Sequence, residues 1–84
     1  MSESIENYLS DTINLLIEEA RGSSDKMQML RASGPSAALE FETGRSFGLF
    51  QAVSLLHSQL LGFNLDPTKV GFPAGFDPDN ELIK

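Results

Sequence analysis

His57 is the only histidine in the sequence and could act as a general base or a metal ligand. Two serines, Ser54 and Ser58, lie close to it in the chain. A serine nucleophile also needs an orienting third group and donors for an oxyanion, and serines one or three residues away supply neither. The chain contains no cysteine, so thiolate catalysis and zinc sites with cysteine ligands are excluded. His57 also has no glutamate at metal-ligand spacing on its helix. We therefore expect a protein that is not an enzyme and that holds no metal or cofactor.

Three acidic residues near the C-terminus, Asp77, Asp79 and Glu81, alternate along the chain as the oxygen ligands of a calcium loop do. Such a loop needs a glycine at its sixth position, and none occurs there. Helix capping and solubility therefore explain these acids better than calcium binding. Gly71 and Gly75 do not form a phosphate loop, because no Lys-Ser or Lys-Thr pair follows either glycine.

Arg45 is followed by twenty uncharged residues, from Ser46 to Leu65. Seven of these twenty are polar and no basic cluster flanks them, so we do not expect a membrane-spanning helix. Glu42 lies three residues before Arg45, and the two side chains are expected to pair locally on a helix. In the alternative, Arg45 binds a carboxylate of a partner or of the C-terminal acids.

The chain carries twelve Asp and Glu against six Lys and Arg, a formal net charge of −6. This balance excludes the cationic footprint that binding to nucleic acid requires. The N-terminal residues are acidic and their apolar positions are spaced, unlike a secretory signal, so a cytoplasmic protein is expected. Asp11, Glu18 and Glu19 lie on the outer part of the first predicted helix. They either steer the protein toward a basic partner or only keep it soluble.

Apolar residues at three- and four-residue steps predict an amphipathic first helix over about residues 4–31. The stripe begins at Ile5 and continues through Ile13 and Ile17. The sequence Gly-Ser-Ser at 22–24 leaves open a break in this helix. Residues 33–36, Ser-Gly-Pro-Ser, suit the end of one helix and the start of the next. A helical hairpin is therefore expected, with the second helix over residues 36–61.

The second predicted helix is apolar on nearly every side. Such a helix is usually central, so we expect one side to contact the first helix and another to contact the C-terminal segment or a second copy. Gly44, Gly48 and Ala52 stand four residues apart on one face, which lets another helix backbone approach closely. Glycine inside a helix costs about 1 kcal/mol relative to alanine, which indicates a packing role. The contacting helix is either the first helix of the same chain or its twin across a dimer axis.

Residues 62–84 hold three of the four prolines and three of the six phenylalanines, which argues against a long helix. Asp66-Pro67 and Asp77-Pro78 each resemble a helix cap followed by proline at the first helical position. One-turn helices are therefore expected at about 67–70 and 78–83. Between them, the rings of Phe72 and Phe76 are expected to anchor a strap.

These elements predict one all-α domain over residues 1–84, a helical hairpin with a C-terminal strap that pairs into a homodimer with a four-helix core. Small size, acidic charge and the lack of catalytic chemistry favour a non-enzymatic protein-binding module. The leading hypothesis is a small acidic antagonist, of the immunity-protein or phage-encoded-inhibitor type, that occludes a basic site on a larger protein with its acids and exposed aromatic rings. The predicted partner-binding residues are Asp11, Glu18, Glu19, Arg45, Phe72, Phe76, Asp77 and Asp79.

Two other functions are compatible with the same sequence. One is a structural or regulatory subunit, whose apolar second helix mediates assembly with itself or with a larger complex. The other is a small-ligand binder with a pocket between the second helix and the Phe72–Phe76 strap. Gln51, His57 or Arg45 would supply the polar contacts of that pocket.

Overall fold

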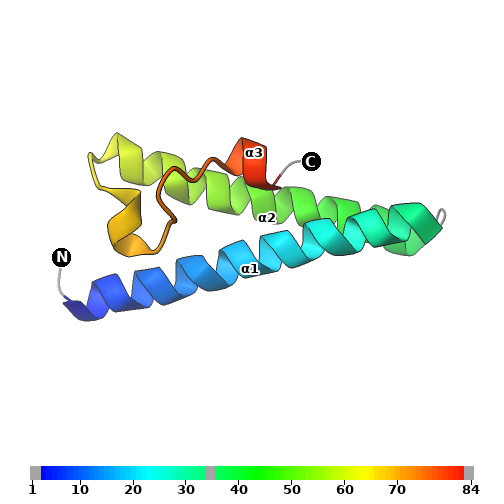
Figure 1. Ribbon diagram of the computed structural model, residues 1–84, viewed down its shortest axis with the longest axis horizontal. Helices are drawn as coiled ribbons and strands as arrows, with labels where there is room; N and C mark the ends of the chain where they lie inside the picture. The colour runs from blue at the N-terminus through cyan, green and yellow to red at the C-terminus, as the bar shows by residue number, and fades with distance from the viewer. Residues whose placement is uncertain (1–2, 34–35, 83–84) are drawn as a thin grey trace.

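Two long helices form the body of the molecule. The computed structural model describes residues 3–33 and 36–82, apart from the side chain of Glu81. Helices α1 (Glu3–Ser33) and α2 (Ala37–Gly62) pack against each other, and a 3-10 helix η1 (Pro67–Val70) and a short helix α3 (Pro78–Leu82) follow (Figure 1). The described residues contain no strand. The predicted all-α class and the packing of two long helices as a hairpin are confirmed. The turn predicted at Gly34 and Pro35, and residue 83 of the last predicted helix, lie outside the described residues.

Helix α1 runs without interruption through Gly22. The sequence left a break at residues 22–24 open, and the structure has the continuous form. Ala20 lies in the core just before the glycine, and the buried Ser23 just after it hydrogen-bonds Glu42 of α2, so α1 is held against α2 on both sides of Gly22. This packing offsets the low helix propensity of Gly22.

Both ends of α2 are capped by side chains or backbone of the neighbouring residues. At its start, the hydroxyl of Ser36 accepts a hydrogen bond from the backbone N–H of Leu39 at 3.2 Å. At its end, Asn64 has a φ of 59°, and the N–H of Leu65 donates to the carbonyl of Leu60 at 2.8 Å. This is the Schellman arrangement, with asparagine in the left-handed position that is more often a glycine. Gly62, where the sequence predicted the stop, is still helical.

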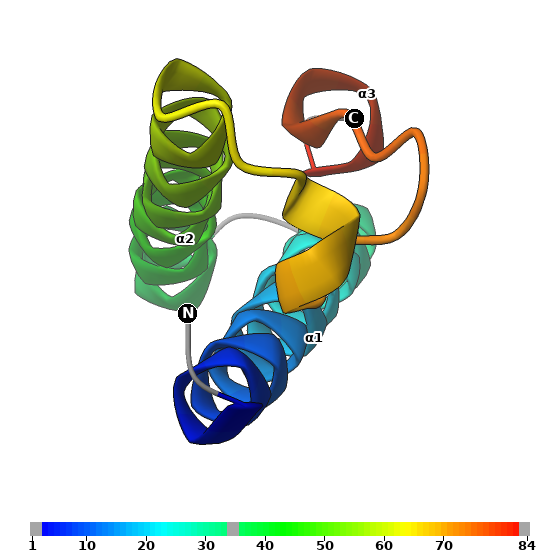
Figure 2. The same cartoon turned by 90° about the vertical axis from the view of Figure 1, so that its left-hand side faces the viewer.

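The C-terminal segment covers one side of the hairpin. Viewed along the long helices, η1 and α3 lie on the same side of the α1–α2 pair (Figure 2). Their apolar side chains complete the core together with one face of each long helix. The core is formed by Ile13, Ile17 and Ala20 of α1, Val53 of α2, and Val70, Phe72, Phe76 and Leu82 of the C-terminal segment.

Candidate functional site

The side of α2 that is turned away from the core is exposed and largely apolar. At 100° per residue this side lies about 140° around the helix from the buried Val53. Phe41 is 71% exposed and Leu55 is 62% exposed. No other described helix covers this side of α2 (Figure 2). We call it the outer α2 face, and it consists of Phe41, Gly44, Gly48, Ala52 and Leu55, all of them exposed.

Gly44 and Gly48 of α2 do not pack against α1. Outside its chain neighbours and the backbone of α2 itself, a Cβ atom added at Gly44 or Gly48 would meet no described atom within 4 Å. Packing within the chain, one of the two possibilities that the sequence left open, is therefore wrong. The reason is the rotation of α2, which buries Glu42, Ser46 and Val53 and turns the two glycines outward.

The buried side of α2 carries a charged cluster that joins it to α1. Glu42 is only 2% exposed, and it accepts hydrogen bonds from the hydroxyl of Ser23 and from Nη1 of Arg45 at 2.8 Å. Nη2 of Arg45 binds the exposed carboxylate of Glu19, and Nζ of Lys26 lies 3.7 Å from Oε1 of Glu42. The predicted local pair of Glu42 and Arg45 is confirmed. Two predicted partner-binding residues, Glu19 and Arg45, thus bind each other within the chain.

This cluster keeps Glu42 ionised. The hydrogen bond from Ser23 and the hydrogen bond from Arg45 hold the pKa of the Glu42 carboxyl below its ordinary value of 4.5, and burial opposes them. The hydrogen bond to Glu42 is also the main reason that the pKa of Arg45 is raised. Buried at 2% exposure and held by Ser23, Arg45 and Lys26, this carboxylate joins α1 to α2.

Two adjacent serines of α1 are predicted to respond in opposite ways to replacement by alanine. The Ser24 hydroxyl is buried and has no hydrogen-bond partner among the described residues. Because a buried hydroxyl without a partner is costly and alanine favours a helix, Ser24→Ala should raise the free energy of unfolding by about 0.5–1 kcal/mol. Ser23→Ala removes a donor to a buried carboxylate and should lower it. Urea unfolding followed by circular dichroism measures both, and a loss of stability in Ser24→Ala would contradict the assignment of its hydroxyl as unpaired.

The two phenylalanines predicted as partner-binding residues lie in the core. Phe72 is 3% exposed and Phe76 is 5% exposed. Their ring centroids lie 5.3 Å apart, and the His57 ring meets Phe72 edge-on at 5.0 Å. The expectation that these rings are exposed binding residues is therefore wrong for this structure, because they attach the C-terminal segment to α2. His57 has a packing role in the same contact.

The polar residues proposed for a ligand pocket do not converge. Arg45, Gln51 and His57 lie about 120° apart around α2, so they face three different directions. Arg45 binds α1, Gln51 is exposed and His57 packs on the strap. Of the three alternatives, only His57 lies against the strap, so Arg45 and Gln51 do not supply polar contacts there.

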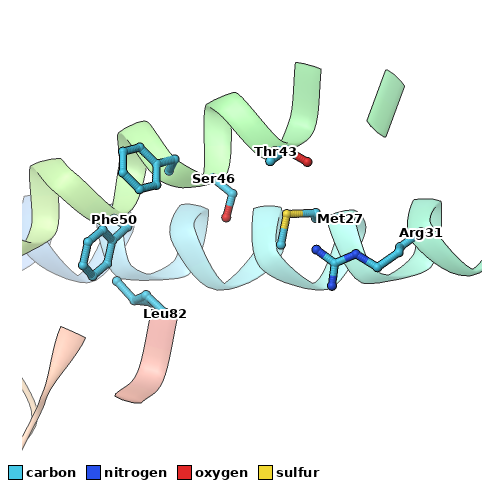
Figure 3. Close-up of a pocket in the computed structure, with 7 residues that line it drawn as sticks. Met27, Arg31, Thr43, Ser46, Phe50 and Leu82 are labelled. Carbon is cyan, nitrogen blue, oxygen red and sulfur yellow. The ribbon is translucent and has the colours of Figure 1, made fainter. Parts of the chain in front are cut away.

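A shallow groove lies elsewhere, at the end of the hairpin beyond α3 (Figure 3). Its volume is about 200 Å³. Small-molecule pockets typically measure about 300–1,000 Å³, so this groove is small for a ligand site. Its lining residues are Met27, Arg31, Thr43, Ser46, Phe47, Phe50 and Leu82.

The remaining predicted acids are distributed over separate parts of the surface. Asp11 and Glu18 are exposed on α1. Asp77 accepts hydrogen bonds from the N–H of Asp79 at 3.1 Å and from the side chain of Asn80 at 2.9 Å, so it caps α3. Asp79 is exposed at the start of that helix. These acids form no single site with Arg45.

Comparisons of this chain with protein-family models, curated proteins and solved structures give no match. Within residues 3–33 and 36–82, no group of three or more His, Asp or Glu side chains is placed to hold a metal ion. None of the helices in this part of the chain is both long and apolar enough to cross a membrane.

Proposed function

We propose that this chain is a non-enzymatic protein-binding module that works as an assembly subunit and docks through the outer α2 face. The observation that carries the proposal is the exposure of Phe41 and Leu55 beside Gly44 and Gly48, at which an added Cβ would meet no described atom outside α2. Burying a large apolar side chain contributes about 1.5–3 kcal/mol, and interior helical glycine is unfavourable without a packing partner. Another protein that covers this face would bury the two apolar side chains and give the two glycines a packing partner.

The chemistry of the outer α2 face favours a helix as the docking element. Gly44, Gly48 and Ala52 form a strip without bulky side chains, and Phe41 and Leu55 stand at its two ends. A second helix backbone can approach such a strip closely and pack between the larger residues. The predicted homodimer and an assembly with a different protein would both use this face.

A second candidate function, the acidic antagonist, is favoured by a different surface. Asp11, Glu18 and Asp25 follow each other at seven-residue spacing on α1 and are all exposed. Residues at this spacing lie on one side of a helix. The exposed side chains of Tyr8 and Leu15 adjoin them and would supply apolar contacts to a basic partner.

The outer α2 face is tested by Gly48→Leu, with Gly22→Leu as the matched control. Both positions are exposed helical glycines with open space at the added Cβ, so both variants should fold and gain almost 1 kcal/mol of helix propensity. We expect Gly48→Leu to weaken association at least about tenfold, equal to about 1.4 kcal/mol, and Gly22→Leu to leave it unchanged. Association is measured as molar mass by light scattering and as capture of other proteins from a lysate of the native host.

The same experiment separates the two candidates. Unchanged mass and unchanged capture for Gly48→Leu would reject docking through the outer α2 face. Loss of capture in Glu18→Lys, stronger at low salt than at high salt, would instead favour the acidic antagonist. Glu18 is suited to this test because it is exposed on α1 and is not part of the Glu42 cluster.

A further inference from the structure

We propose that the outer α2 face binds a second copy of this chain, with the two α2 helices antiparallel and crossing at Gly48. This inference rests on the proposed function, because it names the partner of the same face. Four steps support it: the symmetry of the residue pattern, the surplus surface of the single chain, the distribution of charge, and the steric openness of the glycines.

The residue pattern of the face is symmetric about Gly48. The other four members stand seven and four residues before it and four and seven residues after it. In an antiparallel pair related by a two-fold axis at Gly48, Phe41 meets Leu55 of the second copy and Gly44 meets Ala52. Apolar side chains then pair at both ends, and small residues meet in the middle where the backbones are closest. The spacings are those of any helix face, and the part specific to this chain is the residue type, with large apolar side chains at both ends and small residues between them.

The single chain exposes more surface than a compact protein of its mass. Its accessible surface is 5554 Å², whereas about 4,900 Å² is expected for a monomer of this size. Its radius of gyration is 14.4 Å against about 12 Å expected, and its extents are 47 × 21 × 17 Å. The excess of about 650 Å² per chain approaches the ~800 Å² that each partner buries in a stable complex. A second copy on the outer α2 face would cover part of this excess.

Although the chain has a net charge of −6, its charged residues are distributed so that two copies can meet at this face. The sequence has no charged residue between Arg45 and Asp66, and the guanidinium of Arg45 is held by Glu19 and Glu42. Glu40, exposed at the start of α2, would face the uncharged second half of the other α2 in an antiparallel pair. A parallel pair would bring both copies of Glu40 to the same level, which is less favourable.

Steric openness completes the argument. The space at Gly44 and Gly48 is empty in the single chain, so a second backbone can enter without displacing any described side chain. The two Gly48 residues at the crossing point would then lie within the Cα separation of about 4.4–6.8 Å that a disulfide spans.

The experiment uses single-cysteine variants of the full chain, which has no cysteine of its own. Gly48→Cys should form a disulfide-linked dimer under mild oxidation, at least about tenfold more than Gly22→Cys, because pairing raises the effective thiol concentration. Phe41→Cys and Leu55→Cys should cross-link efficiently when mixed, and each should cross-link poorly alone. All four positions are exposed, and circular dichroism checks that each variant remains helical.

Each result has a defined meaning. Strong cross-linking of Phe41→Cys with itself and of Leu55→Cys with itself would overturn the antiparallel arrangement. A monomeric mass over about a hundredfold range of concentration, with no excess cross-linking of Gly48→Cys, would overturn the second copy as partner. In that case the proposed function stands if Gly48→Leu still loses the capture of another protein, and fails with the inference if it does not.

Discussion

Replacement of Gly71 by alanine is expected to lower the free energy of unfolding by about 2–4 kcal/mol. Gly71 follows η1 with a φ of 106°, in the region that side chains other than glycine rarely adopt. A Cβ atom at this position would lie 2.7 Å from the carbonyl oxygen of Ser10 and 2.9 Å from its Cα. Both are backbone atoms of α1 and cannot move aside, so the segment around η1 would have to lift from the helix. Urea unfolding followed by circular dichroism measures the loss.

Gly75→Ala is the matched control for this prediction. Gly75 also has a positive φ, 71°, but an added Cβ there meets no atom within 4 Å. This variant should therefore show only the conformational cost of the left-handed region, about 1–2 kcal/mol. An equal loss in the two variants would contradict a close approach of Gly71 to α1 and would assign the whole effect to the backbone conformation.

The two long helices are predictable from the sequence because helix periodicity is a local property. Apolar residues such as Ile13 and Ile17 mark the buried stripe of α1, and both are in the core. The serine at position 36 precedes α2 and caps it, as its position before the apolar run suggests. Each of these features depends on residues within a few positions of one another.

The contacts between elements are not predictable in the same way. Ser23 and Glu42 are nineteen residues apart, and their hydrogen bond depends on how α1 and α2 are rotated about their own axes. Because α2 is apolar on nearly every side, its hydrophobic pattern does not indicate which side meets α1. The position of Glu42 on the same side of α2 as Val53 gives no signal by itself, because a charged residue more often marks an exposed side of a helix.

The burial of Phe72 and Phe76 in the strap was likewise not predictable from the sequence. Their spacing around Pro73 indicates an irregular segment, and an irregular segment carries no periodicity from which a buried side can be assigned. Both rings are buried in the core formed by α1, α2 and the C-terminal segment, and His57, one helical turn beyond Val53, contacts them at 5.0 and 6.0 Å. A lone histidine near the end of an apolar helix gives no sign of this contact in the sequence.

Substitution of Glu42 by glutamine is expected to lower the thermal midpoint at neutral pH by about 5 °C or more. Glu42→Gln keeps the size of the side chain but removes the charge that Arg45 and Lys26 face, and it leaves the guanidinium without its best acceptor. Glu40→Gln is the matched control, because it removes the same charge from an exposed position two residues earlier on α2. Differential scanning calorimetry of the three proteins measures the effect.

The effect should also depend on pH with a defined sign. Because the folded protein lowers the pKa of Glu42, the stability due to its carboxylate is fully present above the ordinary carboxyl value of 4.5 and is lost as the pH falls through the lower folded value. The parent protein should therefore lose more stability than Glu42→Gln as the pH falls below about 4.5, and their difference should shrink. Asp66, whose pKa is lowered mainly by the Thr68 hydroxyl, titrates in both proteins and cancels in the comparison.

Ser23 provides the independent check on this mechanism. Its hydroxyl is the main cause of the lowered pKa of Glu42, so Ser23→Ala should raise that pKa, as followed by carboxyl chemical shifts in an NMR titration. Ser24→Ala removes a hydroxyl one residue away that does not contact Glu42, and it should leave the titration unchanged. If the stability difference between the parent and Glu42→Gln stayed constant from neutral to acid pH, the destabilisation would come from packing or hydrogen-bond geometry and not from the buried charge.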